Sequence, residues 1–94
     1  MNRYLVLYHL TEVEQTDAQW NDFIAVLRAG GHLSGGSALA KPSAVEGGAT
    51  AAPRSQTVGG YMVLNAVSEA EVHSLAKLSP CHANGGLVEI FALV

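Results

Sequence analysis

The sequence predicts an α+β fold with elements in the order β-α-β-β-α-β, and three observations support it. The apolar run from Arg3 to His9 suits a strand that is buried on both faces. Residues 58–66 form a second strand-like run, and each of these two runs is followed by a helix-capping motif. With 94 residues in all, the chain is expected to form one domain over 1–94.

The first helix is predicted by a capping box and an apolar stripe. Thr16 begins the box, because its hydroxyl can accept from the backbone while Gln19 reaches back. Apolar residues then recur at the spacing of one helix face, and Gly30-Gly31 ends the helix. The stripe consists of Trp20, Phe23, Ile24 and Leu27.

A weaker strand is expected over 32–40, where Gly35 and Gly36 indicate a bend or a close backbone approach. An edge position tolerates such glycines best. Residues 41–57 are rich in Ala, Gly, Ser and Pro, with a turn signal at 46–48. We expect a mobile segment that contains a short hairpin.

The second half of the chain repeats the rhythm of strand and helix. A second capping box begins at Ser68, and its helix ends before Pro80, which cannot continue it. A turn is expected over 81–86 and the last strand over 87–93.

Two β-α-β units with right-handed crossovers interlock most simply as a ferredoxin-like sandwich whose first and third strands are central. Strand direction then places His9, the 41–57 loop, the start of the third strand and the turn at 81–82 at one end of the sheet, and His32 at the other. No aspartate is expected at this candidate site end, because Asp17 and Asp22 belong to the first helix.

His82 and His9 are the candidate catalytic residues, since imidazole titrates near neutral pH and suits acid–base chemistry. The alternative is that neither histidine is catalytic. His82 would then be an ordinary surface residue in a turn, and His9 an ordinary residue at a strand end. Cys81 is a candidate nucleophile or ligand contact beside His82, although no third orienting group is evident.

No metal site is predicted, because the histidines and the cysteine lack a further ligand and a metal-binding spacing. The glycine pairs spell no phosphate loop, so no cofactor is expected. Lys41 and Arg54, at either side of the mobile loop, are candidates to bind a small anionic ligand, with solubilising loop charges as the alternative. Glu89 is expected to form a structural pair with Arg3.

Composition narrows the partners and the setting. A net charge of -3 with 14% charged residues argues against nucleic acid as a partner. No apolar stretch has the length of a membrane span, no signal peptide is evident, and the single cysteine suits a reducing cytoplasm. Because so short a chain buries only about 60 to 65% of its unfolded surface, self-association is expected.

The chain resembles the YCII-related proteins, in the branch named for a DGPF motif. The resemblance rests on R-Y-L-V-L-Y at 3–8, L-S-G-G-S-A-L at 33–39, V-G-G-Y-M-V-L at 58–64 and above all S-P-C-H-A-N-G-G-L-V-E-I at 79–90. It spans nearly the whole chain. The family implies a homodimer that pairs through the open sheet face into a dimeric α+β barrel, with a cleft beside the sheet.

The sequence departs from this family at the motif that names the branch. Residues 52–57 read A-P-R-S-Q-T, so both the Asp and the Phe of D-G-P-F are missing. Ser37, a candidate ligand contact, stands where the family often has Glu, and His82 lies one place later than the family's usual histidine.

Two functions follow from these expectations. The first is cofactor-free acid–base chemistry on a small carbonyl or carboxylate metabolite. The alternative is a small-ligand-binding or interaction module that has lost the family's acidic residue and does not catalyse.

Overall fold

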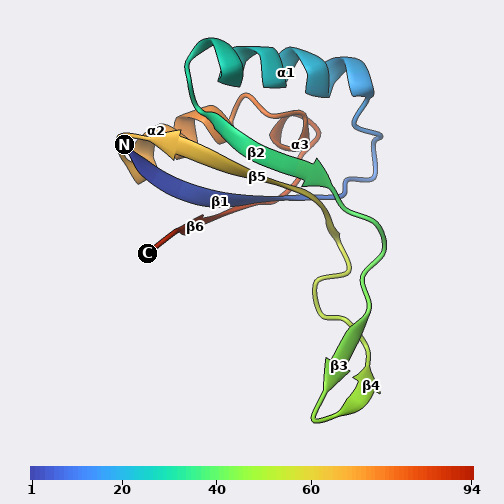
Figure 1. The fold of residues 1–94 in the computed structure, drawn as a ribbon. Helices are drawn as coiled ribbons and strands as arrows, with labels where there is room; N and C mark the ends of the chain where they lie inside the picture. The colour runs from blue at the N-terminus through green and yellow to red at the C-terminus, as the bar shows by residue number, and fades with distance from the viewer.

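The computed structural model describes residues 1–94 as a four-stranded antiparallel sheet with its helices on one face and a separate hairpin (Figure 1). The sheet order is β2-β5-β1-β6, which confirms the ferredoxin-like α+β fold with the first and third long strands at the centre. None of its helices has the length and apolar character needed to cross a bilayer. The elements are β1 (Asn2–His9), α1 (Asp17–Ala29), β2 (Leu33–Ala38), β3 (Ala44–Glu46), β4 (Ala49–Ala51), β5 (Val58–Ala66), α2 (Glu69–Ala76), α3 (Pro80–Ala83) and β6 (Val88–Ala92).

Helix α1 forms as its sequence predicts. The hydroxyl of Thr16 accepts from the Gln19 backbone N–H, and the Gln19 side chain accepts from the Thr16 N–H, so the capping box is complete. Phe23 and Leu27 are buried and pack with the partly buried Trp20 and Ile24 against the sheet. The helix therefore lies on the sheet through its one apolar stripe.

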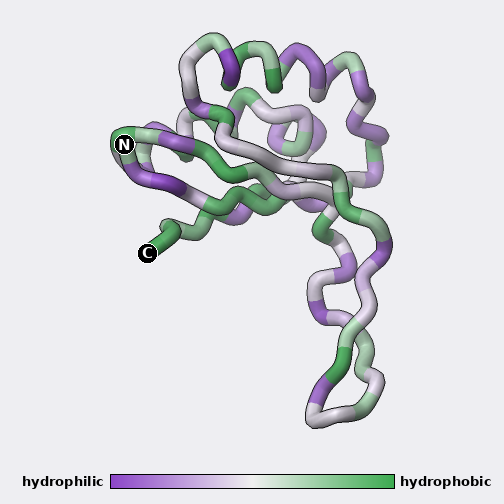
Figure 2. The backbone as a smooth tube through the Cα atoms, viewed as in Figure 1, coloured by the Kyte–Doolittle hydropathy of each residue, from purple (hydrophilic) through white to green (hydrophobic).

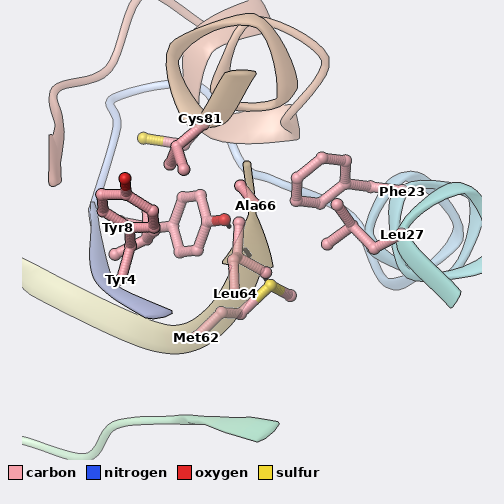
Figure 3. Close-up of a cluster of buried hydrophobic side chains, with 10 residues drawn as sticks. Tyr4, Tyr8, Phe23, Leu27, Met62, Leu64, Ala66 and Cys81 are labelled. Atoms are coloured by element: carbon pink, nitrogen blue, oxygen red, sulfur yellow. Dashed lines mark hydrogen bonds between the residues drawn. The ribbon is translucent and has the colours of Figure 1, made fainter. Parts of the chain in front are cut away.

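The core lies between the sheet and the helices (Figure 3). Alternate residues of each strand point into it, while the residues between them face the side of the sheet that carries no helix, which we call the open face. In Figure 2 the apolar colouring covers the C-terminal part of β6 and the end of the chain. The buried cluster comprises Tyr4, Val6, Tyr8, Phe23, Leu27, Met62, Leu64, Ala66, Val72 and Cys81.

The edge strand β2 approaches β5 closely at Gly36. A Cβ at this position would lie 2.5 Å from the Tyr61 carbonyl oxygen and 3.0 Å from Met62 Cα. The register shifts between Leu33 and Gly35, so the glycine pair marks both an irregularity and a close approach. Only a residue without a side chain fits at Gly36.

The expected hairpin in the 41–57 segment is present. Strands β3 and β4 pair only with each other, and Gly47 and Gly48 turn the chain between them with φ of 59° and 83°. The hairpin extends away from the body of the domain (Figure 1). Its mobility remains a prediction.

Two details of the second half differ from expectation. The hydroxyl of Ser68 caps α2 by accepting from the Glu71 N–H, but the Glu71 carboxylate accepts from the Val67 N–H, so the second capping box is not reciprocal. Residues 80–83 form the short helix α3 rather than a turn. Pro80 begins this helix, because the first turn needs no N–H from that residue, and Ser79 caps it.

We expect Gly36→Ala to lower the free energy of unfolding by about 1 to 3 kcal/mol, because the new Cβ forces β2 away from β5. Gly35→Ala is the matched control, since a Cβ there meets nothing within 4 Å. Its effect should stay within about 0.5 kcal/mol. Urea unfolding followed by circular dichroism measures both, and equal losses in the two variants would contradict the close approach.

Candidate functional site

A groove of about 770 Å³ lies between α1 and the sheet, at the end where β1 finishes. We call it the α1 groove. Its size falls within the range of small-molecule sites, and its walls combine aromatic and aliphatic side chains with a few polar groups. The residues that line it are Tyr8, His9, Leu10, Thr11, Glu12, Glu14, Gln15, Asp17, Trp20, Ile24, Arg28, Leu33, Gly35, Gly36, Ser37, Ala38, Gly59, Gly60, Tyr61 and Met62.

The groove exists because the sheet carries small residues beneath α1. Ala38 pairs with Gly60, and Gly60 pairs with Tyr8, whose side chain is buried under the helices. Directly paired residues share a face of the sheet, so Gly36, Ala38 and Gly60 all face the helix side. Larger residues there would fill the space below Trp20 and Ile24.

Acidic residues surround the mouth of the groove. Glu12, Glu14 and Asp17 line it and are exposed. Arg28 is the only lysine or arginine among the lining residues. The expectation that no aspartate lies at this end was wrong. Only seven residues separate β1 from α1, so the first turn of the helix returns to the end where β1 finishes.

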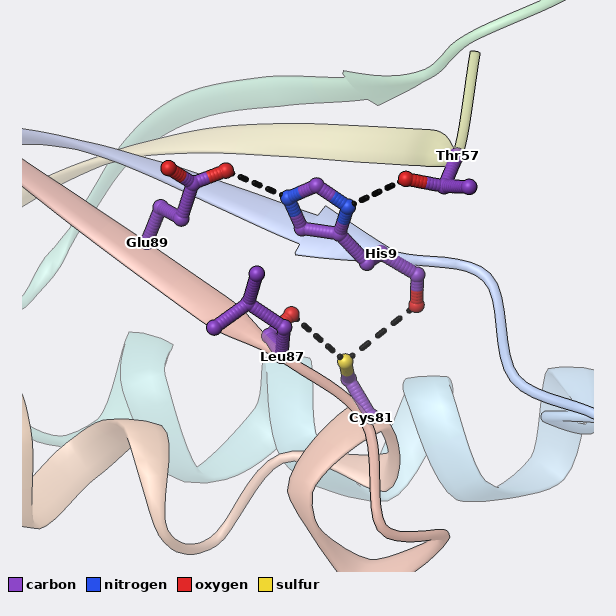
Figure 4. Close-up of polar contacts among 5 residues, drawn as sticks. All are labelled: His9, Thr57, Cys81, Leu87 and Glu89. Carbon is purple, nitrogen blue, oxygen red and sulfur yellow. Dashed lines mark hydrogen bonds and ion pairs between the residues drawn. The ribbon is translucent and has the colours of Figure 1, made fainter. Parts of the chain in front are cut away.

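His9 forms a hydrogen-bonded array with Thr57 and Glu89 (Figure 4). Its Nδ1 lies 2.7 Å from Thr57 Oγ1, and its Nε2 lies 2.5 Å from Glu89 Oε1. The His9 side chain is 13% exposed and that of Glu89 is 41% exposed. The array thus joins an imidazole to a carboxylate on one nitrogen and a hydroxyl on the other.

The expected pair of Glu89 with Arg3 is not formed. In the register of β1 with β6, Glu89 stands opposite Leu7, beside His9, whereas Arg3 lies at the other end of β1. A single sequence does not specify this register, so neither Glu89 nor Thr57 was predicted as a partner of His9.

Cys81 is buried and takes no part in the groove. Its Sγ lies 3.3 Å from the carbonyl oxygens of both His9 and Leu87, to which the thiol proton can be donated. Burial raises the pKa of the Cys81 thiol, although the contact with the His9 carbonyl acts in the opposite direction. A buried thiol with a raised pKa is a poor nucleophile, and its role here is to link α3 to the end of β1.

Three other predicted site residues lie away from the groove. His82 is exposed on α3, and its side chain makes no hydrogen bond to His9. Arg54 is exposed and pairs with Glu46 of the hairpin at 3.3 Å, and Lys41 is exposed as well. Ser37 does line the groove, with its hydroxyl donating to the Ala38 carbonyl.

The titratable groups do not cluster as a metal site would require. No group of three or more His, Cys, Asp or Glu side chains is arranged to hold a metal ion.

His32 lies at the opposite end of the sheet, as expected, with Nδ1 2.9 Å from the Asn65 carbonyl oxygen and 3.8 Å from Glu71 Oε1.

Among solved structures, the chain is similar to 5-chloro-2-hydroxyhydroquinone dehydrochlorinase (TftG) from Burkholderia phenoliruptrix, in complex with 2,5-dihydroxybenzoquinone. The TM-score is 0.58 at 14% identity, over 98% of this chain and 93% of that chain. The two proteins share a fold. The match extends over the whole domain, including both β-α-β units.

No protein-family model matches the chain, and neither does any curated protein sequence. The resemblance to the YCII-related proteins therefore depends on the sequence motifs described above.

Proposed function

We propose that the protein binds a small, uncharged ring compound with a carbonyl group in the α1 groove and exchanges protons with it through His9, without a cofactor. The observation that carries this proposal is the groove itself, whose lining reaches His9 at the end of β1. The His9 imidazole and the Glu89 carboxylate lie on the open-face side of that strand end, because Glu89 stands opposite Leu7, so the ligand has to reach past the end of β1 to meet the imidazole (Figure 4). A relationship to the YCII-related proteins is part of the proposal, supported by the motif at 79–90.

The walls of the groove favour a flat apolar ligand without negative charge. Tyr8 and Trp20 supply aromatic surface, and five aliphatic or thioether side chains supply most of the remaining apolar lining. Three carboxylates against one guanidinium would repel a carboxylate ligand. The small anion expected from Arg54 and Lys41 is therefore disfavoured, and a neutral carbonyl compound fits better.

His9 supplies the proton chemistry in this proposal. Glu89 holds Nε2, which orients the ring and stabilises the imidazolium that forms when the histidine accepts a proton. Thr57 is exposed and holds Nδ1, so its hydroxyl can pass a proton between the ring and water. Abstraction of a proton next to a carbonyl is the reaction that such a base performs.

The alternative is a binding module without catalysis. One observation favours it: both ring nitrogens of His9 already have partners, so the base is occupied until one of them moves. The missing Asp of the DGPF motif points the same way. Binding in the groove is common to both functions, and only proton exchange separates them.

A homodimer through the open face is also proposed. Val63, Leu5 and Phe91 stand side by side across three strands of this face, and Leu7 continues the apolar surface. Phe91 is 48% exposed in the single chain. Pairing two such faces would cover this apolar surface.

We expect light scattering at micromolar concentration to give twice the 9.8 kDa of the single chain. Leu7→Asp should convert the protein to a monomer, because a charge would be buried in the interface. Val45→Asp, on the exposed hairpin, is the control and should leave the mass unchanged. A wild-type monomer would overturn the dimer.

Ala38→Leu should weaken the binding of acetophenone by about ten-fold or more, because the larger side chain occupies the groove. Ala40→Leu adds the same side chain two residues further on, outside the lining, and should bind as the wild type does. NMR titration of each labelled variant gives the affinities, with 2,5-dihydroxybenzoquinone as a second probe. Equal affinity in the two variants would remove the groove as the site.

The wild-type protein should speed deuterium uptake by the methyl group of acetophenone in D₂O by about a hundred-fold over buffer. His9→Gln should lose this rate, whereas His73→Gln should keep it, because His73 is exposed on α2 and forms no part of the groove. Proton NMR follows the loss of the methyl signal. Binding without any exchange would establish the non-catalytic alternative instead.

A further inference from the structure

Tyr8 has a buried hydroxyl with only a weak partner. The residue is 2% exposed and lines the α1 groove, yet its hydroxyl donates only to the thioether sulfur of Met62, at 3.5 Å. Thioether sulfur is a poor acceptor, and the phenol of a buried tyrosine usually has an oxygen or nitrogen partner. The donor capacity of Tyr8 is thus largely unused in the free protein.

The ring of Tyr8 is fixed in place by its aromatic neighbours. Trp20 meets it edge to face, with centroids 5.0 Å apart at 80°, and Phe23 does so at 6.2 Å and 82°. Both contacts come from α1, the helix that forms the side of the groove opposite the sheet. A phenol held in this way can offer its hydroxyl to a ligand without first losing rotational freedom.

The groove reaches the contact between the phenol and the Met62 sulfur, because both residues line it. Gly60 of β5 stands across from Tyr8, and Gly36 of β2 stands across from Met62, so these two positions place no side chain beside the contact. On the β6 side, Val88 stands across from Tyr8. Burial raises the pKa of Tyr8 well above its usual range, and the proximity of Cys81 acts in the same direction. The phenol therefore stays protonated and remains a donor.

We propose that the hydroxyl of Tyr8 exchanges the Met62 sulfur for the carbonyl oxygen of the bound ring compound. Tyr8 is then the residue that makes the groove select a carbonyl compound over a hydrocarbon of the same shape. When a proton leaves the carbon beside the carbonyl, negative charge moves to that oxygen, and the bond from Tyr8 strengthens. This inference rests on the proposed binding of a ligand in the groove.

The test uses two probes of nearly equal shape, acetophenone and ethylbenzene, which differ in the carbonyl oxygen. Tyr8→Phe retains the ring and its aromatic contacts. It should weaken the binding of acetophenone about five-fold and change the affinity for ethylbenzene by less than about two-fold. Met62→Leu conserves volume and removes the competing acceptor. It should tighten the binding of acetophenone by about two-fold, because the hydroxyl no longer has to leave the sulfur.

Three outcomes would overturn the inference, and they are distinguishable. If neither probe binds the wild type, the proposed function and the inference fail together. If both probes bind and Tyr8→Phe weakens them equally, the groove is the site but Tyr8 only shapes it. If Met62→Leu weakens acetophenone as much as Tyr8→Phe does, the contact between the two side chains is structural, and the hydroxyl serves the fold.

Discussion

The close approach of β2 and β5 is the constraint on which the candidate site depends. Gly36 sits so near the Tyr61 carbonyl that no side chain fits, and its neighbours on the helix side, Ala38 and Gly60, are also small. Meanwhile α1 is held at a fixed height by Phe23 and Leu27, which are buried in the core. The buried residues of α1 set its distance from the sheet, and the sheet beneath the rest of the helix carries these small residues. A groove therefore remains between them. Its volume is thus a consequence of packing rather than of flexibility.

The end of β1 connects this groove to the rest of the domain. The His9 carbonyl oxygen accepts from the Gln15 side chain, which holds the loop that forms one wall, and it also lies within reach of the Cys81 thiol. The His9 imidazole joins β6 and the base of the hairpin through Glu89 and Thr57. Several segments distant in sequence therefore meet at one residue. A ligand that altered His9 would affect all of them.

The sequence predicts the fold well because the signals for it are local. The capping box at Thr16 and the apolar stripe of α1 specify the helix, and the handedness of β-α-β crossovers then fixes the strand order. The direction of the strands also places His9 and the start of β5 at one end, as expected. Pro80 was ambiguous, because a proline that ends one helix can equally begin another.

The sequence predicts the site less completely, because the site depends on the register between strands and on the absence of side chains at particular positions. The partner of His9 is decided by which residue of β6 stands beside it, and a one-residue shift would turn Glu89 to the other face. The pair Gly35-Gly36 indicates a bend or a close backbone approach, and the close approach is confirmed, but the sequence does not indicate that missing side chains on the helix side create a groove. His82 lies at the expected end of the sheet. Because residues 80–83 form the helix α3 rather than the expected turn, its side chain is on an exposed helix face.

The central claim is that a neutral ring compound lies in the α1 groove, against the aromatic residues of the core. Isotope-filtered NOEs between unlabelled acetophenone and the labelled protein test this claim most directly. We expect contacts from the ligand ring to the Trp20 indole and the Met62 methyl group, because both residues line the groove. Contacts to Leu5 and Phe91 on the open face, with none to Trp20, would contradict it.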